Sequence, residues 1–493
     1  MRYRENGSQS ISGQGGNVIK NTGKISKRDI MNIKSLDLLL VNPSFDWESE
    51  RIQRMTMRIE KDRPNQEAPL LNIAYLIAAA KKANLRVKFI DMVVDGFGTG
   101  ELLEFISKTK PPLIGFTAFT KQICDVGKVS EQIKHKIPNA IICVGGCHAS
   151  AIPKQTLEEF AGIDFVFCGE AEEQLPKIFD YLKNPGALAK LHGVVTRETN
   201  VFQPGIIENL DEIPFPAWEE FDLTKYPGNV SHRTELPIIT SRGCPFSCTF
   251  CCRSSGEKVR YRSVNLVISE IERNIEKFGC ETVHFYDENF LLDKKRTRQL
   301  FFELNNSGLN KKIKWTCSMR VDKVTPELVV NMKKAGCYRI FFGFESANNN
   351  TLKIIKKGTN VSQMLQAVRI TKQAGIVPTG AFMIGLPGDT EEDVYKAIEL
   401  GKELDLYSIT FPILVPYPGT EIREQALKNM YGMRIISNNW EYYGRKSIDS
   451  KEDFEILESA DLSAKKRREL QIVAYSKHPK KNMEEYLRRS LRT

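Results

Sequence analysis

"ELPIITSRGCPFSCTFCC" (235–252) decides how the rest of the chain is interpreted. A short apolar run leads into a loop where four of the 11 cysteines fall within residues 240–252. The spacing Cys244-x3-Cys248-x2-Cys251 puts three thiolates on one loop, where they can converge on one metal centre. Structural zinc usually takes two separated pairs of ligands, and no second pair follows here. Three thiolates favour a [4Fe–4S] cluster with one iron left open, and Cys252 is predicted to point away from it.

Downstream of these cysteines, apolar runs of strand length alternate with amphipathic segments of helix length. The predicted strands cover 235–240, 282–288, 313–319, 338–345, 377–385 and 408–415. The predicted helices cover 263–278, 293–306, 325–335, 361–374 and 390–404. Six βα units are too few for a closed eight-stranded barrel, so the pattern predicts a partial (β/α)6 barrel. Its active site is expected at the carboxyl ends of the strands, where the cysteines follow the first strand.

A separate alternation of strands and helices precedes the cysteine loop. Its predicted strands cover 36–41, 87–91, 112–117, 140–146 and 164–170. Its predicted helices lie near 70–84, 99–108, 122–136, 153–161 and 172–183. This pattern predicts a Rossmann-like, doubly wound parallel sheet, which binds ligands beyond the carboxyl ends of its strands. The segments "GFTAFT", "VGGCHAS" and "CGEAEE" stand at those ends.

Composition divides the rest of the chain. Residues 1–34 are polar and predicted to be a disordered tail, 35–187 form the front domain, and 188–234 form an irregular linker packed across two domains. The barrel covers 235–427, and 428–493 is a small, basic, mostly helical region. The aromatic residues Trp440, Tyr442 and Tyr443 in that last region are expected either to line the site or to serve as core or lid.

Charge and cysteine usage describe a cytoplasmic globular protein of 493 residues. The net charge of +10 comes from two tails: 1–34 hold seven Lys/Arg against two Asp/Glu, and 461–493 hold ten against four. We therefore expect solvated tails and no nucleic-acid partner. No apolar run reaches membrane-spanning or signal-peptide length. The cytoplasm disfavours disulfides, so core packing is expected for the scattered cysteines Cys124, Cys143, Cys168, Cys280, Cys317 and Cys337.

The cysteine spacing, with the aromatic Phe250 before the third cysteine, resembles the signature of radical S-adenosylmethionine (radical SAM) enzymes. The resemblance covers about 236–425 and continues through "RYRSVNLVISEIE", "FYDENFLLD", "FFGFES" and "MIGLPGDTEED". It implies that Cys244, Cys248 and Cys251 ligate a [4Fe–4S] cluster whose open iron chelates SAM. It further implies reductive cleavage of SAM to a 5′-deoxyadenosyl radical that abstracts a hydrogen atom, with an electron donor such as flavodoxin or ferredoxin as partner.

Further positions follow from the same resemblance. Gly243 and Pro245 shape the cysteine loop, Arg320 meets the methionine carboxylate or a substrate anion, and Glu345 meets the SAM ribose. The remaining candidates for SAM binding are Phe250, Tyr286, Asp287, Glu288 and Gly385, the last through close approach of adenine. For Arg320 and Glu345, a structural salt bridge is the alternative.

Residues 36–190 resemble the cobalamin-binding domain that precedes the barrel in one large class of these enzymes, through "LLLVNPS", "VGGCHAS" and "VFCGEAEE". None of the six histidines stands in the Asp-x-His-x-x-Gly motif that supplies a lower ligand in many cobalamin domains. Members without this motif bind cobalamin with its nucleotide tail detached. The candidate pocket residues are Thr117, Thr120, Gly145, Gly146, His148 and Glu170. The alternative for the whole domain is that it no longer binds cobalamin. The alternative for His148 is a histidine with a structural role only.

The resemblance favours a C-methyltransferase acting on a small molecule or peptide, in which methylcobalamin delivers the methyl group to the substrate radical and a second SAM re-methylates the cobalamin. One alternative keeps both cofactors but carries out oxidative cyclisation or rearrangement without methyl transfer. A second is a methylthiotransferase of RNA, which would need a second cluster in the front domain, from cysteines among Cys124, Cys143, Cys147 and Cys168. A cobalamin sensor without enzymatic activity is the third.

Overall fold

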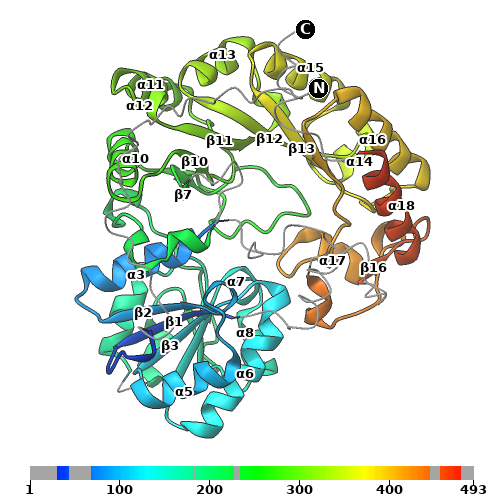
Figure 1. Cartoon of the computed structure of the whole chain (residues 1–493). Helices are drawn as coiled ribbons and strands as arrows, with labels where there is room; N and C mark the ends of the chain where they lie inside the picture. Colours follow the sequence, from blue (N-terminus) through cyan, green and yellow to red (C-terminus); the bar gives the residue numbers. More distant parts are fainter. Residues whose placement is uncertain (1–29, 44–67, 183–184, 227–233, 445–455, 479–493) are drawn as a thin grey trace, which may run out of the picture.

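The computed structural model describes residues 30–43, 68–182, 185–226, 234–444 and 456–478. Figure 1 shows the front domain below, the arch of barrel strands and helices above, and the C-terminal region beside both. Of the predicted tail 1–34, residues 1–29 lie outside the described residues, and Ile30 is buried in the front-domain core.

The front domain contains a six-stranded sheet in the order β2-β1-β3-β4-β5-β6. The first five strands are parallel and β6 is antiparallel to β5. This is the order of a doubly wound sheet, in which strands are added first on one side of β1 and then, from β3 on, on its other side. The strands are β1 (Leu38–Asn42), β2 (Val87–Asp91), β3 (Leu113–Thr117), β4 (Ile141–Gly145), β5 (Phe165–Phe167) and β6 (Val194–Val195). All five predicted strands are confirmed, and β6 lies in the segment predicted as linker, because a pair of buried valines is too short to signal a strand.

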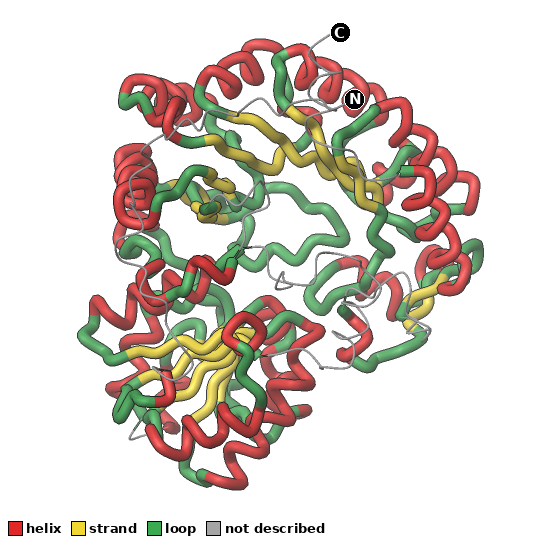
Figure 2. The backbone as a smooth tube through the Cα atoms, in the orientation of Figure 1, coloured by secondary structure: helices red, strands yellow, loops and turns green. Residues whose placement is uncertain are grey.

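Helices cover both faces of this sheet, as Figure 2 shows. Alternate side chains of β1 point into two different cores, Leu38 and Leu40 into one and Leu39 and Val41 into the other. The helices are α3 (Leu71–Lys82), α4 (Met92–Asp95), α5 (Thr99–Thr109), α6 (Ile123–Lys136), α7 (Cys147–Ala151), α8 (Pro153–Glu159) and α9 (Gln174–Lys177). The helix predicted over 172–183 is only one turn plus a 3-10 turn, because Pro176 offers no backbone N–H to the helix.

The barrel contains six parallel strands in the order β14-β13-β12-β11-β10-β7. They are β7 (Glu235–Ile238), β10 (Thr282–Phe285), β11 (Lys314–Met319), β12 (Cys337–Glu345), β13 (Val377–Phe382) and β14 (Ser408–Thr410). The two edge strands are not joined to each other, so the predicted partial barrel is confirmed. Strand β14 is shorter than predicted because Pro412 cannot donate to a ladder.

The predicted barrel helices are all present within two residues of their expected ends. They are α10 (Val264–Phe278), α11 (Lys294–Asn306), α13 (Pro326–Lys334), α15 (Val361–Gln373) and α16 (Glu391–Leu404). Two short helices were not predicted, α12 (Leu309–Lys312) and α14 (Asn349–Ile354). Local capping explains the helix starts: the Thr390 hydroxyl accepts from Asp393 N–H at the start of α16.

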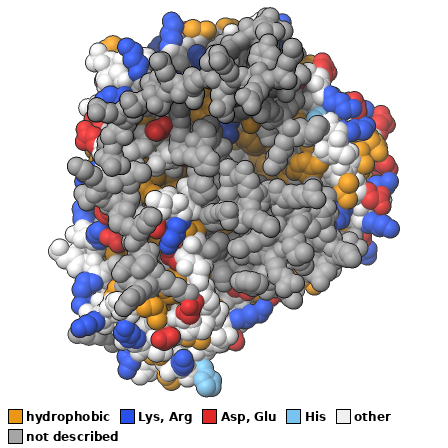
Figure 3. Space-filling view, viewed as in Figure 1, with side chains coloured by type: hydrophobic (Ala, Val, Ile, Leu, Met, Phe, Trp, Pro, Cys, Tyr) orange, Lys and Arg blue, Asp and Glu red, His pale blue; other side chains and the backbone are white. Residues whose placement is uncertain are grey.

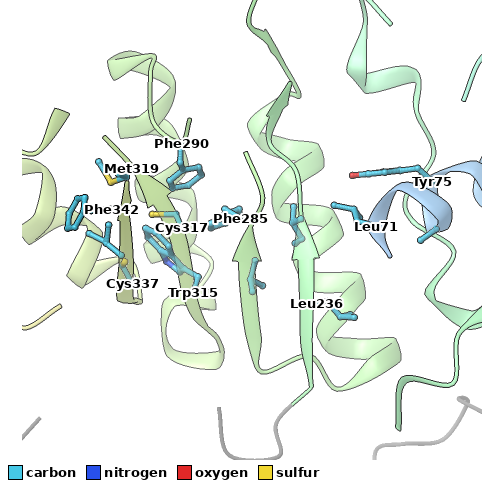
Figure 4. Packing of buried hydrophobic residues seen from close by; sticks show 14 of the residues in the cluster. Leu71, Tyr75, Leu236, Phe285, Phe290, Trp315, Cys317, Met319, Cys337 and Phe342 are labelled. Carbon is cyan, nitrogen blue, oxygen red and sulfur yellow. The ribbon is translucent and has the colours of Figure 1, made fainter. Parts of the chain in front are cut away.

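Large aromatic side chains fill the space between the barrel strands and their helices. Phe285 stacks on Phe290 at 4.6 Å between ring centroids, and Trp315 meets both edge-on. Figure 4 shows this packing, with Leu71 and Tyr75 of α3 on the other side of β7. Because α3 belongs to the front domain, the two domains share one continuous apolar core.

The segment predicted as linker packs between these domains. Ala217 N–H donates to the Ala74 carbonyl of α3 at 3.0 Å, and the Arg273 guanidinium on α10 donates to the Pro216 carbonyl at 3.0 Å. Trp218 is fully buried in the shared core. The relative placement of the two domains is therefore fixed by packing along this segment.

The C-terminal region contacts both domains. The segment predicted as barrel ends with α17 (Glu421–Leu427), and the C-terminal region then contains the antiparallel pair β15 (Arg434–Ile435) and β16 (Leu457–Glu458), the 3-10 turn η9 (Trp440–Tyr443) and α18 (Ala464–Lys477). Trp440 Nε1–H donates to Glu159 Oε2 of the front domain at 2.6 Å, and Gln471 donates to the Phe411 carbonyl of the barrel at 2.8 Å. Trp440 and Tyr443 are buried, so they serve as core and do not line a site. Where described residues form the face in Figure 3, acidic and basic side chains are mixed.

Candidate active site

The cysteine loop is closed at its base by two short paired strands. Strands β8 (Ser241–Arg242) and β9 (Arg260–Tyr261) are antiparallel, with Arg242 opposite Arg260. Gly243 has φ +95°, and a Cβ there would lie 2.3 Å from the Lys258 carbonyl oxygen, so only glycine fits this turn. Figure 2 shows the long loop on the concave side of the barrel sheet.

Three thiols of this loop share one environment. Cys244 and Cys248 are partly buried, Cys251 is exposed on one side, and Cys251 N–H donates to the Cys248 carbonyl at 3.1 Å. Crowding by protein atoms raises the pKa of the Cys251 thiol to about 12, and the nearby Cys248, Glu288 and Cys244 raise it further. Metal binding would have to remove these protons, since the thiolate is the ligand.

Among the described residues, no three His, Cys, Asp or Glu side chains converge closely enough to hold a single metal ion. A [4Fe–4S] cluster binds each thiolate through a different iron, so its ligands stand farther apart than those of one ion. Three thiols on one exposed loop, within electrostatic reach of one another, are a donor set that fits such a cluster.

Cys252 lies on the side of the loop that faces the front domain. Its Sγ is 3.7 Å from the position of a Cβ built on Gly419, and the Cβ of Ala151 is 2.9 Å from that same position. It also raises the pKa of Cys147 on α7, although burial is the larger cause. Cys252 is also within electrostatic reach of Cys251 and Glu288, so the expectation that it is not a ligand stays a prediction.

Arg320 lies over the cysteine loop. Its guanidinium carbon is 3.9 Å from the centroid of the Phe246 ring, and its Nε donates to Asp322 Oδ1 at 2.9 Å. Its second terminal nitrogen donates weakly to the Gly358 carbonyl at 3.4 Å. The first terminal nitrogen, Nη1, is buried and finds no partner among the described residues. This spare donor fits the anionic group that the sequence assigns to Arg320.

Glu345 ends β12 beside the same loop. It has φ +69°, a strained value for a residue with a side chain, and its carboxylate accepts from Lys357 Nζ at 2.7 Å. The Lys357 ammonium lies 5.7 Å from the centroid of the Phe250 ring. The structure therefore brings the predicted residues Phe250 and Glu345 together through Lys357. A SAM ribose could replace one of these contacts, and this role stays a prediction.

The three residues after β10 alternate in direction. Tyr286 and Glu288 are exposed, whereas Asp287 is buried and accepts from the Thr240 N–H at 3.1 Å, the Thr240 hydroxyl at 2.8 Å and the Ser241 hydroxyl. Asp287 therefore ties β10 to the start of the cysteine loop, and its contact with SAM stays a prediction. Glu288 remains near the thiols; crowding by protein atoms raises the pKa of its carboxyl group, and hydrogen bonds from Ser255 oppose this rise.

Gly385 has a different neighbour from the one predicted. Its φ is +83°, and a Cβ there would lie 2.6 Å from the guanidinium carbon of Arg467 on α18. Arg467 is fully buried, and its Nε donates to the Leu462 carbonyl at 3.2 Å. Close approach of this arginine accounts for the glycine, so the adenine contact has no support from this geometry.

The carboxyl ends of the front-sheet strands, where such sheets bind ligands, form what we call the ligand edge of the front sheet. At this edge Gly146 has φ +108°, and a Cβ there would lie 2.5 Å from the Ala118 carbonyl oxygen. A Cβ on Gly145 would meet only Phe167 Cβ, at 3.8 Å. This open cradle, with the exposed ring of Phe119 after β3, fits a large planar cofactor. Thr117 accepts a long hydrogen bond of 3.4 Å from Asn72, and Thr120 is buried in the next turn.

Two predicted pocket residues have other partners. His148 is buried edge-on against Trp440 at 5.0 Å between ring centroids, and burial lowers its pKa to about 4. It therefore packs as a neutral core residue. Glu170 accepts from Arg260 at 2.7 and 2.8 Å and from the Ile207 N–H at 2.7 Å. Protein donors already contact both oxygens of its carboxylate, and its contact with cobalamin stays a prediction.

Sequence reasoning missed the arginines at the base of the cysteine loop. Arg242 and Arg260 are both buried and reach Glu170 and Glu172 of the front domain. A signal was present, because charged residues flank the loop on both sides in "TSRGC" and "VRYRS". Their partners could not be inferred, since they come from a loop about 70–90 positions earlier in the chain.

Two family models match the chain. The model of the B12 binding domain matches residues 62–179, and the model of the Radical SAM superfamily matches residues 238–401. This is the predicted order of the two domains. Among the described residues, no helix combines the length and apolar character that crossing a membrane requires.

The curated relatives include methyltransferases and cyclases. An uncharacterized methyltransferase of Pyrococcus horikoshii is 31% identical over 420 residues, covering 83% of this chain and 87% of the relative. A cytidylyl-2-hydroxyethylphosphonate methyltransferase of Streptomyces wedmorensis is 25% identical over 456 residues, covering 79% and 82%. An anaerobic magnesium-protoporphyrin IX monomethyl ester cyclase of Cereibacter sphaeroides is 28% identical over 374 residues, covering 72% and 60%.

Two solved structures share the fold. The radical SAM methyltransferase TsrM from Kitasatospora setae, with tryptophan and a SAM analogue bound, gives a TM-score of 0.64 at 19% identity and covers 84% of this chain and 81% of its own. The cobalamin-dependent SAM radical enzyme OxsB, with aqua-cobalamin and SAM bound, gives 0.61 at 22% identity and covers 80% and 56%. At these identities the likeness concerns the fold, and it confirms the predicted α/β fold class.

Proposed function

The chain belongs to the radical SAM enzymes with an N-terminal B12-binding domain, and from this membership we propose that it methylates a carbon centre of a small-molecule or peptide substrate. Its cofactors are a [4Fe–4S] cluster, SAM and cobalamin. The observation that carries the proposal is the meeting of the cysteine loop with the ligand edge of the front domain, where Cys252 and Ala151 flank Gly419. Methyl transfer is supported by the two relatives that are named methyltransferases.

The cluster would be held by Cys244, Cys248 and Cys251. When bound, the cluster supplies the electron that cleaves SAM, and cobalamin carries the methyl group. The chain orients these groups: the turn at Gly243 presents the three thiols together, and Asp287 anchors the loop to β10. Both features limit the freedom of the loop before any ligand arrives.

SAM would be held between the cysteine loop and the carboxyl ends of β11 and β12. Arg320 offers a buried nitrogen without a partner in the described part of the chain to the methionine carboxylate. The Glu345–Lys357 pair offers a carboxylate to the ribose, beside the ring of Phe250. Tyr286 and Glu288 face the same side of β10, where the methionine amino group would bind.

Cobalamin would bind at the ligand edge of the front sheet. Gly145 and Gly146 would let its tail approach the backbone, and Thr117 and Thr120 are the polar side chains of that edge. The exposed Phe119 ring would pack against the corrin.

The substrate would bind against the inner face of the barrel. Phe341 on β12 is 38% exposed, and it lies on the opposite face of the strand from its buried neighbours Ile340 and Phe342. Tyr286, which follows β10, is 43% exposed. Arg339 on the same strand is half-buried, and its guanidinium carbon lies 5.7 Å from the centroid of the Tyr338 ring. We call Phe341, Tyr286 and Arg339 together the substrate wall; its aromatic rings and its cation suit a planar group with an acidic substituent. Phe341→Ala should raise KM for such a substrate without changing SAM cleavage in its absence, and an unchanged KM would exclude this wall.

Methyl transfer is tested by anaerobic incubation of the reconstituted enzyme with SAM, cobalamin and a pool of candidate substrates. Mass spectrometry should find a product heavier by one CH2 unit. The same incubation with Cys244→Ala should yield none. A product formed without any mass gain would refute methylation.

Oxidative cyclisation or rearrangement without methyl transfer is the second candidate, supported by the cyclase of Cereibacter sphaeroides. It requires the same three cofactor sites and predicts 5′-deoxyadenosine without S-adenosylhomocysteine. The methylthiotransferase alternative has less support, because Cys143 and Cys168 are buried in separate cores of the front domain.

A further inference from the structure

Two carboxylates of the front domain grip the base of the cysteine loop. Glu170 forms a two-pronged pair with Arg260, with Oε1 2.7 Å and Oε2 2.8 Å from its terminal nitrogens. Glu172 accepts from Arg242 at 2.5 Å, and Glu170 lies 3.5 Å from the other terminal nitrogen of Arg242. All four side chains are less than 10% exposed. We name this group the clamp.

The clamp is rigid for physical reasons. A planar guanidinium that meets both oxygens of a carboxylate fixes distance and orientation together. Because the four charges are buried, breaking one pair would leave an uncompensated charge away from water. Arg242 also lies over the ring of Tyr75 on α3, 5.4 Å from its centroid, which holds it from a second side. The clamp therefore joins the loop after β5 to the base of the cysteine loop at a fixed distance.

One end of the clamp leads to the ligand edge of the front sheet. Glu170 stands three residues after β5, and its N–H donates to the Gly205 carbonyl at 2.8 Å. The loop after β5 is neighbour to the loop after β4, because β4 and β5 pair in parallel. Cobalamin at that edge would therefore restrict the loop that carries both carboxylates.

The other end leads to the thiols. Arg242 precedes Gly243 and Cys244 directly, and Arg260 donates to the Ser255 carbonyl inside the loop at 2.8 Å. The next residue, Gly256, accepts a hydrogen bond from the Cys244 N–H at 3.1 Å. The chain of contacts thus runs without a gap from the front domain to the surroundings of the cluster.

We propose that the clamp couples the two cofactor sites, so that cluster assembly in the cysteine loop strengthens cobalamin binding, with Glu170 as a positioning residue. Each cofactor restrains one of the two loops that the clamp joins, so less conformational freedom remains to be lost when the second cofactor binds. Coupling between sites is reciprocal, so cobalamin should strengthen cluster retention by the same factor. The inference concerns binding and holds for either transfer chemistry.

The test is a titration of hydroxocobalamin into the full-length chain, followed by absorbance, with and without the reconstituted cluster. The wild-type dissociation constant should be about tenfold lower with the cluster, in the range typical of coupled sites. In Glu170→Gln, which keeps the shape of the side chain, the ratio of the dissociation constants without and with the cluster should fall to near one. The variant should still bind cobalamin in the presence and in the absence of the cluster. The electron paramagnetic resonance spectrum of the reduced cluster should shift on cobalamin addition in wild type and not in the variant.

A matched control is a second ion pair to the cysteine loop, formed by Lys258 of that loop with Glu208 of the segment between the domains. Glu208 pairs with Lys258 at 2.6 Å, but both side chains are exposed, so Glu208→Gln should leave the ratio unchanged. Equal affinities with and without the cluster in wild type would overturn the proposal, whether or not Glu170→Gln folds. A ratio that persists in Glu170→Gln, or one that falls equally in Glu208→Gln, would also overturn it.

Discussion

Gly146→Ala should destabilise the front domain by about 3 kcal/mol. The backbone at this position, φ +108° and ψ 176°, lies in a region that only glycine occupies at low cost, and a side chain there costs about 1–3 kcal/mol. An added Cβ would stand 2.5 Å from the Ala118 carbonyl oxygen. Relief of that clash would weaken the hydrogen bond from Ala118 N–H to the Gly145 carbonyl, 2.9 Å long, which is worth about 1 kcal/mol.

The assay is thermal unfolding of the anaerobically purified chain, followed by circular dichroism. A loss of about 3 kcal/mol should lower the melting temperature by roughly 6–12 °C for a domain of this size. Gly145→Ala is the control: its Cβ would make only an ordinary contact with Phe167, so the free energy of unfolding should change by less than about 1 kcal/mol. The same control should weaken cobalamin binding, because its Cβ would enter the open cradle. A Gly146→Ala variant as stable as wild type would refute the reasoning.

Cys252→Ala should keep the iron content of wild type, whereas Cys244→Ala should lose SAM cleavage; loss of iron in Cys252→Ala would mean that the wrong three cysteines were assigned. Burial raises the pKa of Asp91 from 3.8 to about 6 in the folded chain, against hydrogen bonds that lower it, so the folded state binds the extra proton between these values. The contribution of this group to the free energy of unfolding is therefore fully present below pH 4 and falls by about 3 kcal/mol as pH rises through 6. Asp91→Asn should remove this difference between the free energies of unfolding measured in urea at pH 4 and pH 7. An Asp91→Asn variant with the wild-type pH dependence would contradict the assignment. Trp440→Phe should cost about 1.5–3 kcal/mol, because it leaves Glu159 without the indole donor, and an unchanged melting temperature would show that the C-terminal region does not dock there.

The fold was largely predictable because its signals are local. Buried strands such as Leu113–Thr117 are nearly continuous apolar runs between helices, and the cysteine loop can be recognised from its spacing alone. The failures are also local in origin: Pro176 breaks a helix that apolar periodicity alone predicts, and β6 is too short to recognise.

The candidate site was harder to predict, because its side chains are chosen by partners that are distant in sequence. Asp287 and Glu170 are polar residues at strand ends, where ligands bind, and sequence gives no sign that Thr240 or Arg260 already occupies them. Gly385 was assigned to a ligand, yet Arg467 from the last described helix takes the space. Residues whose role depends only on their own loop, such as Gly243, were interpreted correctly.

The most direct test of methyl transfer is simultaneous measurement of 5′-deoxyadenosine and S-adenosylhomocysteine from the enzyme loaded with cluster and cobalamin, turning over under anaerobic conditions. We predict that both products accumulate together in comparable amounts when a substrate is present, and that neither forms with Cys244→Ala. Accumulation of 5′-deoxyadenosine alone, with product formed, would contradict methyl transfer and favour the cyclase chemistry.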